Sequence, residues 1–185
     1  MKKGFTLIEL LVVIAIVAVL AVAVVLVLNP AELLRQGRDA TRLSDMGTLS
    51  GAIALYMSDV TTPSLGTVTS CYVYNAVAPT LPANCDGRHA VTRTTAWDAD
   101  RTTDGNGWIP INLSAVSVGS PLSILPIDPA HSAVTGGQFY SYANTATTWE
   151  IDANLESTKF ATQEGVDGGD KPALYEVGND PGLDI

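Results

Sequence analysis

An uninterrupted run of 19 apolar residues, from Leu10 to Leu28, dominates the N-terminal part of the chain. A helix needs about 20 apolar residues to cross the hydrocarbon core of a bilayer, so the run has the length of a membrane anchor. An ordinary secretory signal is the second interpretation, because Ala21-Val22-Ala23 offers the small residues of a cleavage site. The apolar part of such signals usually has about 7–15 residues, however, and here more apolar residues follow Ala23.

A single carboxylate, Glu9, lies immediately before this run. A carboxylate at the centre of a bilayer costs about 2.5–3.5 kcal/mol, and the cost falls near the interface because the side chain can reach the headgroups. Neither a signal peptide nor a plain anchor requires an acidic residue at this point. On membrane physics alone, Glu9 is therefore either an interfacial residue without a special role or a residue with a function of its own.

Charges are segregated along the chain. Lys2 and Lys3 precede the apolar run, which favours a cytoplasmic N-terminus. From residue 60 onward, 5 basic residues stand against 14 acidic ones, and this acidic part is then expected outside the cytoplasm. The formal net charge of -9 and the scattered arginines provide no basic stripe for phosphate contacts, so the composition argues against a nucleic-acid partner.

The chain has two cysteines, Cys71 and Cys85, and both lie in the part expected outside the cytoplasm. An oxidising compartment permits a disulfide between them. Such a bond would close a loop of about 15 residues and contribute roughly 3 kcal/mol on the chain-entropy model. The alternative is a pair of free thiols in the core.

Helical patterning continues after the apolar run, beyond an interruption at Asn29-Pro30. Proline lacks the backbone donor and clashes with the preceding turn. This predicts either a kink at Pro30, or a helix end at Leu28 followed by a new helix with Pro30 in its first turn. After the joint, apolar residues at three- and four-residue spacing predict packing against a sheet, and Thr61-Thr62-Pro63 predicts the helix end. The apolar stripe consists of Met46, Leu49, Ile53, Tyr56 and Val60, and the face expected in solvent consists of Arg35, Arg38, Asp39, Arg42 and Asp45.

Three later segments have the composition of strands, at residues 70–76, 139–143 and 148–155. In the last of these, apolar residues alternate with Glu150 and Asp152, which predicts one buried face and one face in water. Residues 79–107 are polar and irregular and are expected to be exposed. The economical arrangement is an α+β fold, in which a long N-terminal helix packs its second half on a small antiparallel β-sheet.

The string Gly4-Phe5-Thr6-Leu7-Ile8-Glu9, directly after two lysines and before the long apolar run, resembles the N-terminal signal of type IV prepilins and type II secretion pseudopilins. The resemblance implies a pilin-like fold with a β-rich head. It also implies that a prepilin peptidase cuts between Gly4 and Phe5 and that the new amine of Phe5 is methylated. Glu9 would then be the acidic residue that is important for subunit addition.

Cleavage would change the charges at this end of the helix. The nitrogen of Phe5 becomes an α-amine that is mostly protonated at neutral pH, and the charges of Lys2 and Lys3 are removed. The new cation can meet Glu9 of a neighbouring subunit. In an apolar filament core such a pair is favoured chiefly because either charge alone is costlier. We therefore expect Glu9 to set the register between subunits more than to add stability.

Later segments are similar to major pseudopilins and related pilins, whereas residues 61–124 are largely without a counterpart. The similar segments are residues 29–59, 125–129 (LPIDP), 139–142 (FYSY) and 149–157 (WEIDANLES). The resemblance implies a chain in four parts. These are a cytoplasmic leader at 1–4, a membrane and filament-core helix at 5–28, an amphipathic helix at 29–60 and an extracellular head at 61–185.

No catalytic constellation is evident in the sequence, and we expect a structural protein rather than an enzyme. His89 and His131 have no metal-type spacing to each other or to the cysteines, so both are expected on surface loops. Two acidic loops offer oxygen ligands for calcium, one at residues 98–107 and one around Asp167 and Asp170. Major pseudopilins commonly hold calcium in a late loop of the head, and this resemblance favours Asp167 and Asp170. The alternative is a solvated acidic loop without a metal.

The combined interpretation is a structural subunit, a pilin, of a type IV pilus-like filament that polymerises through its N-terminal helix. The implied partners are other copies of the chain, the prepilin peptidase, and an inner-membrane assembly platform with its ATPase. The subunit would wait in the cytoplasmic membrane, with its N-terminus in the cytoplasm, and end in a cell-surface or other extracytoplasmic filament. Two alternatives stay open: a major pseudopilin of type II secretion, and a monomeric anchored or secreted binding domain.

Overall fold

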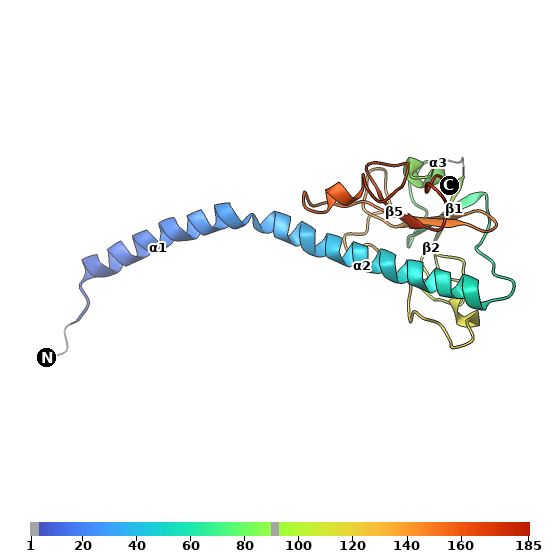
Figure 1. Ribbon diagram of the computed structural model, residues 1–185. Coiled ribbons are helices and arrows are strands. Elements are labelled where there is room, and N and C mark those ends of the chain that lie inside the picture. Colours follow the sequence, from blue (N-terminus) through green and yellow to red (C-terminus); the bar gives the residue numbers. More distant parts are fainter. Residues whose placement is uncertain (1–3, 90–92) are drawn as a thin grey trace.

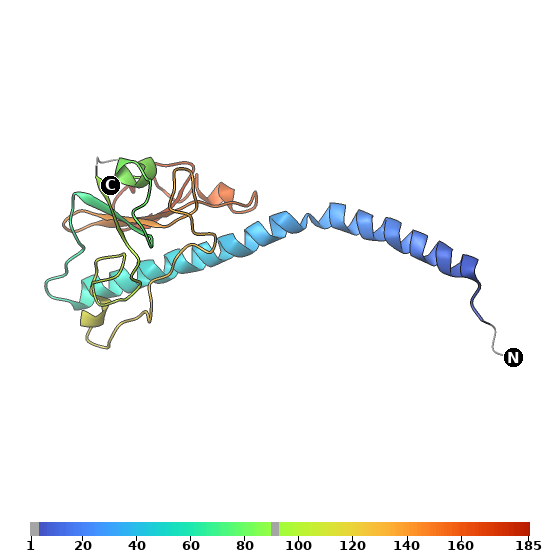
Figure 2. The same cartoon turned by 180° about the vertical axis from the view of Figure 1, so that it is seen from behind.

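The computed structural model describes residues 4–89 and 93–185 and shows a long helical stem with a head at one end (Figure 1). Two helices make up the stem, α1 (Leu7–Leu28) and α2 (Pro30–Asp59). α1 extends away from the head, whereas α2 runs along one face of a β-sheet. The view from behind shows the same arrangement (Figure 2). The chain therefore presents its first helix apart from the folded head.

The stem bends at Asn29, between the two helices. Asn29 has φ 40° and ψ 71°, in the left-handed region that asparagine tolerates better than most residues. Its side-chain oxygen accepts a hydrogen bond from Glu32 N at 3.4 Å, and Pro30 occupies the first turn of α2. The joint combines features of both predictions, because the stem bends here (Figure 1) while α1 ends at Leu28 and α2 begins with Pro30.

The sheet has five strands in the order β2-β1-β3-β4-β5. They are β1 (Ser70–Tyr74), β2 (Thr94–Asp98), β3 (Ser141–Asn144), β4 (Trp149–Ala153) and β5 (Tyr175–Gly178). The predicted fold, a long helix packed on a small sheet, is confirmed, and the three predicted strands are present as β1, β3 and β4. Short 3₁₀ helices occur at η1 (Leu113–Ala115) and η2 (Ala161–Gln163).

The sheet is mixed and not wholly antiparallel as predicted. β2 pairs with β1 in parallel, whereas the pairs β1–β3, β3–β4 and β4–β5 are antiparallel. Parallel neighbours need a crossover connection rather than a tight turn. Here the connection between β1 and β2 contains the short helix α3 (Ala83–Gly87), which returns the chain to the end of the sheet where β1 began.

The core of the head lies between α2 and the sheet. Four of the five predicted stripe residues are buried, and the fifth, Val60, is partly buried against the same cluster. Residues 61–124 contribute to this core through Trp108, Ile109 and Ile111, so this segment is more than a surface loop. The strands contribute Tyr142, Trp149, Ile151 and Ala153 to the buried part of this core.

The polar face of α2 differs from the prediction of a solvated face. Asp39 and Arg42 have no exposed surface, because the loops that carry Asp128 and Glu156 fold over this part of the helix. Arg42 donates hydrogen bonds to Asp39 at 2.7 Å, to Asp128 at 2.7 and 2.9 Å, and to Glu156 at 2.9 Å. These four residues, here called the Arg42 network, join α2 to two loops of the head.

The outer face of the sheet, opposite α2, is also buried, although the sequence predicted that this face is exposed to water. Glu150 and Asp152 of β4 are 1% and 0% exposed. The segment around α3 covers this face, and Cys85, Arg88 and His89 within it are buried as well. The prediction that residues 79–107 are exposed was therefore wrong for this part, because the segment packs on the sheet and is tied to it.

Candidate functional site

The surface of α1 is apolar on all sides and exposed. Val19 is 71% exposed and Val27 is 83% exposed, and residues 10–25 are all classed as exposed. Within residues 4–89 and 93–185, the helical region that begins at Leu7 is the one candidate membrane span, and its most apolar part is not buried by the rest of the chain. An apolar surface of this extent marks an interaction with lipid or with other protein chains.

Glu9 lies in the first turn of α1 and caps its own helix. Its Oε2 accepts hydrogen bonds from Thr6 N at 2.7 Å and from Thr6 Oγ1 at 2.8 Å, while Thr6 Oγ1 accepts one from Glu9 N at 3.3 Å. This reciprocal capping box satisfies backbone donors that a helix start leaves without partners. Both contacts use the same carboxylate oxygen, so Oε1 has no hydrogen bond within the described part of the chain.

Gly4 and Phe5 precede the helix in a segment without regular secondary structure, and the Phe5 side chain is 88% exposed. A peptide bond in such a segment can adopt the extended form that a peptidase needs, whereas a bond inside α1 cannot. The structure thus brings the predicted cleavage bond, the predicted methylated residue and Glu9 to one end of the stem. Their roles remain predictions.

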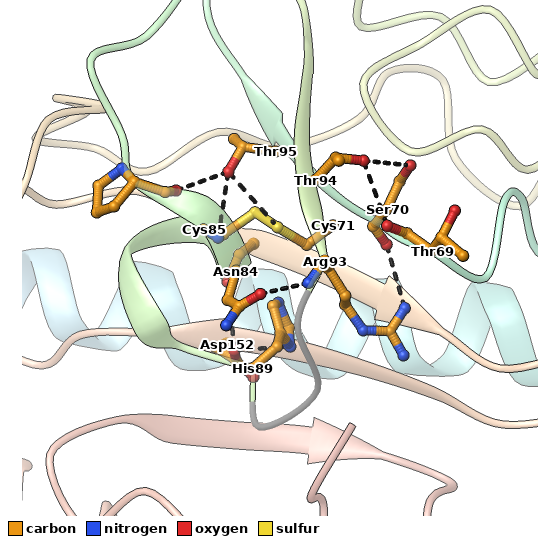
Figure 3. Close-up of a disulfide and its surroundings, with 12 residues drawn as sticks. Thr69, Ser70, Cys71, Asn84, Cys85, His89, Arg93, Thr94, Thr95 and Asp152 are labelled. Carbon is orange, nitrogen blue, oxygen red and sulfur yellow. Dashed lines mark hydrogen bonds and ion pairs between the residues drawn. A yellow bond between two sulfur atoms is a disulfide. The ribbon is translucent and has the colours of Figure 1, made fainter.

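The predicted disulfide joins Cys71 of β1 to Cys85 of α3, with an S–S distance of 2.02 Å (Figure 3). Thr95 of β2 supports it, because its Oγ1 accepts a hydrogen bond from Cys85 N at 3.3 Å and donates one to the carbonyl of Pro82 at 2.9 Å. The bond therefore ties the segment that covers the outer face directly to the sheet. Asn84, Cys85 and Asp86 have φ angles of 61°, 51° and 69°, so α3 departs from right-handed helical geometry at the disulfide.

The carboxylates of the predicted calcium loop are engaged in hydrogen bonds of the loop itself. Asp167 accepts from Gly169 N at 3.1 Å and from Glu176 N at 2.8 Å, and Asp170 pairs with Lys171 at 2.5 Å. Glu176 is buried, and burial together with the surrounding carboxylates raises its pKa to about 8, although a hydrogen bond from Lys171 N opposes the shift. Calcium at Asp167 and Asp170, and the alternative of a metal-free loop, both stay predictions.

The other acidic loop, residues 98–107, is built from short local turns. Asp98 accepts a hydrogen bond from Asp100 N at 2.8 Å, and Asp100 accepts one from Thr102 N at 2.8 Å. Asp104 accepts from Thr102 Oγ1 at 2.8 Å and from Asn106 N at 3.1 Å. These bonds explain the frequency of aspartate, asparagine and threonine in the loop by turn formation.

The two histidines differ in their surroundings. His131 is partly buried, and its ring meets Tyr74 edge-on with the ring centroids 5.1 Å apart. His89 was predicted on a surface loop, and this was wrong, because its side chain is fully buried between Glu150 and Asp152. The spacing of the two acidic residues on one face of a strand was visible in the sequence, but nothing in it placed a histidine 61 residues earlier against them.

Comparison with known proteins finds one family model, described as the prokaryotic N-terminal methylation motif, which matches residues 1–25. No curated protein and no solved structure matches the chain. The match covers the leader, the candidate cleavage bond, Glu9 and most of the apolar run. The comparisons therefore give information on residues 1–25 and none on the head.

Proposed function

We propose that this chain, a member of the type IV pilin and pseudopilin superfamily that carries the prepilin-type methylation signal, is a structural subunit of a type IV pilus-like filament. The fold is pilin-like, with a long N-terminal helix on a five-stranded mixed sheet. The observation that carries the proposal is the exposed apolar helix α1, which projects from a head that already has its own core. In this proposal α1 lies in the lipid bilayer before assembly and packs against α1 of other subunits in the filament.

Processing is the first step of the proposed function. A prepilin peptidase on the cytoplasmic side cuts between Gly4 and Phe5, and the new amine of Phe5 is methylated. Lys2 and Lys3 hold the uncut end at the cytoplasmic face. Until assembly, the subunit stays in the cytoplasmic membrane with α1 across the bilayer and the acidic head outside.

Assembly is the second step. Packing of α1 between neighbouring subunits replaces contacts with lipid by contacts with equally apolar side chains, so this transfer is nearly neutral in hydrophobic free energy. Extraction from the membrane therefore needs energy from an assembly platform and its ATPase. The Phe5 amine of one subunit meets Glu9 of another. The free Oε1 of Glu9 can accept this contact while Oε2 keeps capping the helix.

The role of the head is structural and not enzymatic in this proposal. α2 attaches to the head from its first turn, where Glu32 accepts hydrogen bonds from Thr158 N at 2.8 Å and Thr158 Oγ1 at 2.9 Å. The Arg42 network and the core stripe continue this attachment along α2. The head is therefore held rigidly on the helix that would line the filament, and its outer parts would form the filament surface.

Mass spectrometry of the mature chain tests the proposal most directly. The expected N-terminal peptide begins at Phe5 and carries one added methyl group, and the cells form filaments that contain the chain. The matched variant is Gly4→Leu, which should keep the uncut N-terminus and form no filaments, since a bulky side chain then lies at the cleavage bond. A mature chain that starts after Ala23, or an uncut chain in normal filaments, would refute the proposal.

The second candidate is a major pseudopilin of type II secretion, which would carry the same N-terminal signal and share the pilin-like fold. The two candidates predict different losses in cells from which the gene for this chain is deleted. Loss of surface filaments, seen by electron microscopy, supports the pilus. Retention of surface filaments together with a loss of secreted proteins supports the secretion system.

A further inference from the structure

The outer face of the sheet carries three buried carboxylates beside one another. Glu150 and Asp152 are two residues apart on β4 and so point to the same side, and Asp152 is the direct register partner of Glu176 on β5. The three residues are 1%, 0% and 2% exposed. Buried carboxylates are rare unless they are paired or coordinate a metal, so this group requires a cation or protons to balance it.

His89 lies directly against this group, from the segment that the disulfide ties to the sheet. Its Nδ1 is 3.2 Å from Glu150 Oε1 and 3.5 Å from Asp152 Oδ2. Figure 3 shows His89 beside Asp152. One potential ligand atom from each of His89, Glu150 and Asp152 lies within 4.8 Å of the other two.

The two nearby arginines, Arg88 and Arg93, do not form direct ion pairs with these carboxylates. Arg88 donates to Phe139 O at 2.6 Å and to Asn154 Oδ1, and its guanidinium stacks on the Phe139 ring. Arg93 donates to backbone carbonyls, including that of Asn144 at 2.9 Å. Both arginines act on the cluster through space, Arg88 on Asp152 and Arg93 on Glu150. Within residues 4–89 and 93–185, however, the cluster makes no direct ion pair with an arginine or a lysine.

The cluster also has unused polar atoms. Asp152 Oδ1 and Glu176 Oε1 are buried and lack hydrogen-bond partners within the described part of the chain. His89 Nε2 is likewise buried and lacks a partner in this part of the chain. An unpaired buried acceptor is costly and needs an explanation. A bound cation would supply one.

We propose that His89, Glu150 and Asp152 form a buried site for a divalent transition-metal ion of the zinc type. Ligand atoms at about 2.0–2.2 Å from a tetrahedral zinc lie roughly 3.4 Å apart, and the two distances from His89 Nδ1 match this spacing. Imidazole nitrogen favours zinc and its neighbours in the transition series, whereas calcium and magnesium favour oxygen ligands alone. Solvent or the Glu176 carboxylate completes the coordination.

Two further contacts orient the proposed ligands. Ser141 Oγ donates to Asp152 Oδ2 at 3.3 Å, and the backbone N–H of Ile185 donates to Glu150 Oε2 at 3.2 Å. Second partners of this kind fix a ligand for the metal and are typical of metal sites. The ion would join three parts of the head: the covering segment through His89, strand β4 through Glu150 and Asp152, and the C-terminal residue, whose backbone N–H binds Glu150. Its function is a structural cross-link that acts beside the disulfide.

The test uses the full-length chain in detergent, stripped with a chelator and then dialysed against zinc chloride. Elemental analysis is expected to find one zinc per chain, retained in the presence of excess calcium, and zinc is expected to raise the melting temperature of the head. His89→Gln should lose the zinc. The matched control, His131→Gln, should keep it, because that ring packs on Tyr74 and not on the cluster.

A second measurement tests the proposal even if the His89→Gln variant does not fold. X-ray absorption of the zinc-loaded natural chain should show one imidazole nitrogen together with carboxylate oxygens. The proposal is overturned if the natural chain retains no zinc, if His89→Gln retains as much zinc as His131→Gln, or if the absorption spectrum shows oxygen ligands only. In the first case the buried carboxylates are balanced by protons instead.

Discussion

Replacement of Arg42 by methionine should destabilise the head far more than the loss of any surface charge. Arg42 is fully buried in α2 and is the cation of a network with Asp39, Asp128 and Glu156. Methionine has a similar length and keeps apolar packing, so the change isolates the loss of the guanidinium. The variant leaves the buried carboxylates of Asp39 and Asp128 without the group that neutralises them, whereas Glu156 keeps its ion pair with Arg38.

The expected magnitude follows from the burial of the pairs. Removal of one partner of a buried ion pair costs roughly 3–5 kcal/mol, because the remaining charge stays desolvated. The side chains of Arg42, Asp39 and Asp128 have no exposed surface, and that of Glu156 is 13% exposed, so this range applies without a reduction for solvent screening. It is a large share of the roughly 5–15 kcal/mol that stabilises a typical domain.

Arg35→Met is the matched control on the same helix. Arg35 is 52% exposed and lies 3.9 Å from Glu32, and an exposed pair of this kind contributes about 0–1 kcal/mol. A second variant tests the cause directly. When Asp128→Asn is added to Arg42→Met, part of the lost stability should return, since one uncompensated carboxylate is then removed.

Equilibrium urea unfolding of the full-length chain in detergent, followed by tryptophan fluorescence, gives these free energies. All three tryptophans, Trp97, Trp108 and Trp149, belong to the head, and the last two are buried, so the signal reports the head and not α1. The reasoning is refuted if Arg42→Met costs no more than Arg35→Met. It is also refuted if Asp128→Asn lowers the stability of the Arg42→Met variant further.

The pH dependence provides an independent check. Burial opposes ionisation of Asp39, but hydrogen bonds from Ser157, Glu156 N and Arg42 outweigh it and lower its pKa. Glu156 behaves in the same way through Arg38 and Arg42. A lowered folded pKa means stability that is present at neutral pH and lost as pH falls below about 4 through the folded pKa. The difference in unfolding free energy between the natural chain and the Arg42→Met variant should therefore become smaller in acid.

Three further predictions concern the other sites. The double variant Cys71→Ser/Cys85→Ser should lose roughly 3 kcal/mol in urea unfolding, and a reductant should produce the same loss in the natural chain but none in the variant. Glu9→Val should still be cut and methylated, as seen by mass spectrometry, but should assemble slowly; assembly at the natural rate would end the idea that Glu9 sets register. Calorimetry with calcium separates the two predictions for the late acidic loop: heat that Asp167→Asn/Asp170→Asn abolishes supports calcium there, no heat supports the metal-free loop, and equal heats in both chains contradict a site at these two residues.

The N-terminal helix could be predicted from the sequence because its signals are local. A run of apolar residues, a basic start and one glutamate indicate a membrane helix with a processing signal, whatever the head does. The spacing of Met46, Leu49, Ile53 and Tyr56 likewise predicts which face of α2 is buried, since these residues are neighbours on one helix. Cys71 and Cys85 could be paired because the chain offers only two cysteines.

The buried charges could not be predicted in this way. The alternation along β4 correctly places Glu150 and Asp152 on one face, but periodicity does not say whether water or protein covers that face. The cover comes from the segment around His89, 61 residues earlier, and its position depends on the disulfide and on a parallel strand that the sequence did not predict. Arg42 likewise meets Asp128 across 86 residues and Glu156 across 114.

The sequence by itself thus determined the stem, the processing signal and the apolar contact between α2 and the sheet, because each depends on neighbours along one helix or strand. Only the tertiary structure decided that polar residues of α2 and β4 are buried, and which partners they have. A charged side chain is stable in water or in a paired, buried site, and the choice depends on segments that are distant in the chain. The proposed metal site at His89, Glu150 and Asp152 belongs to this second class.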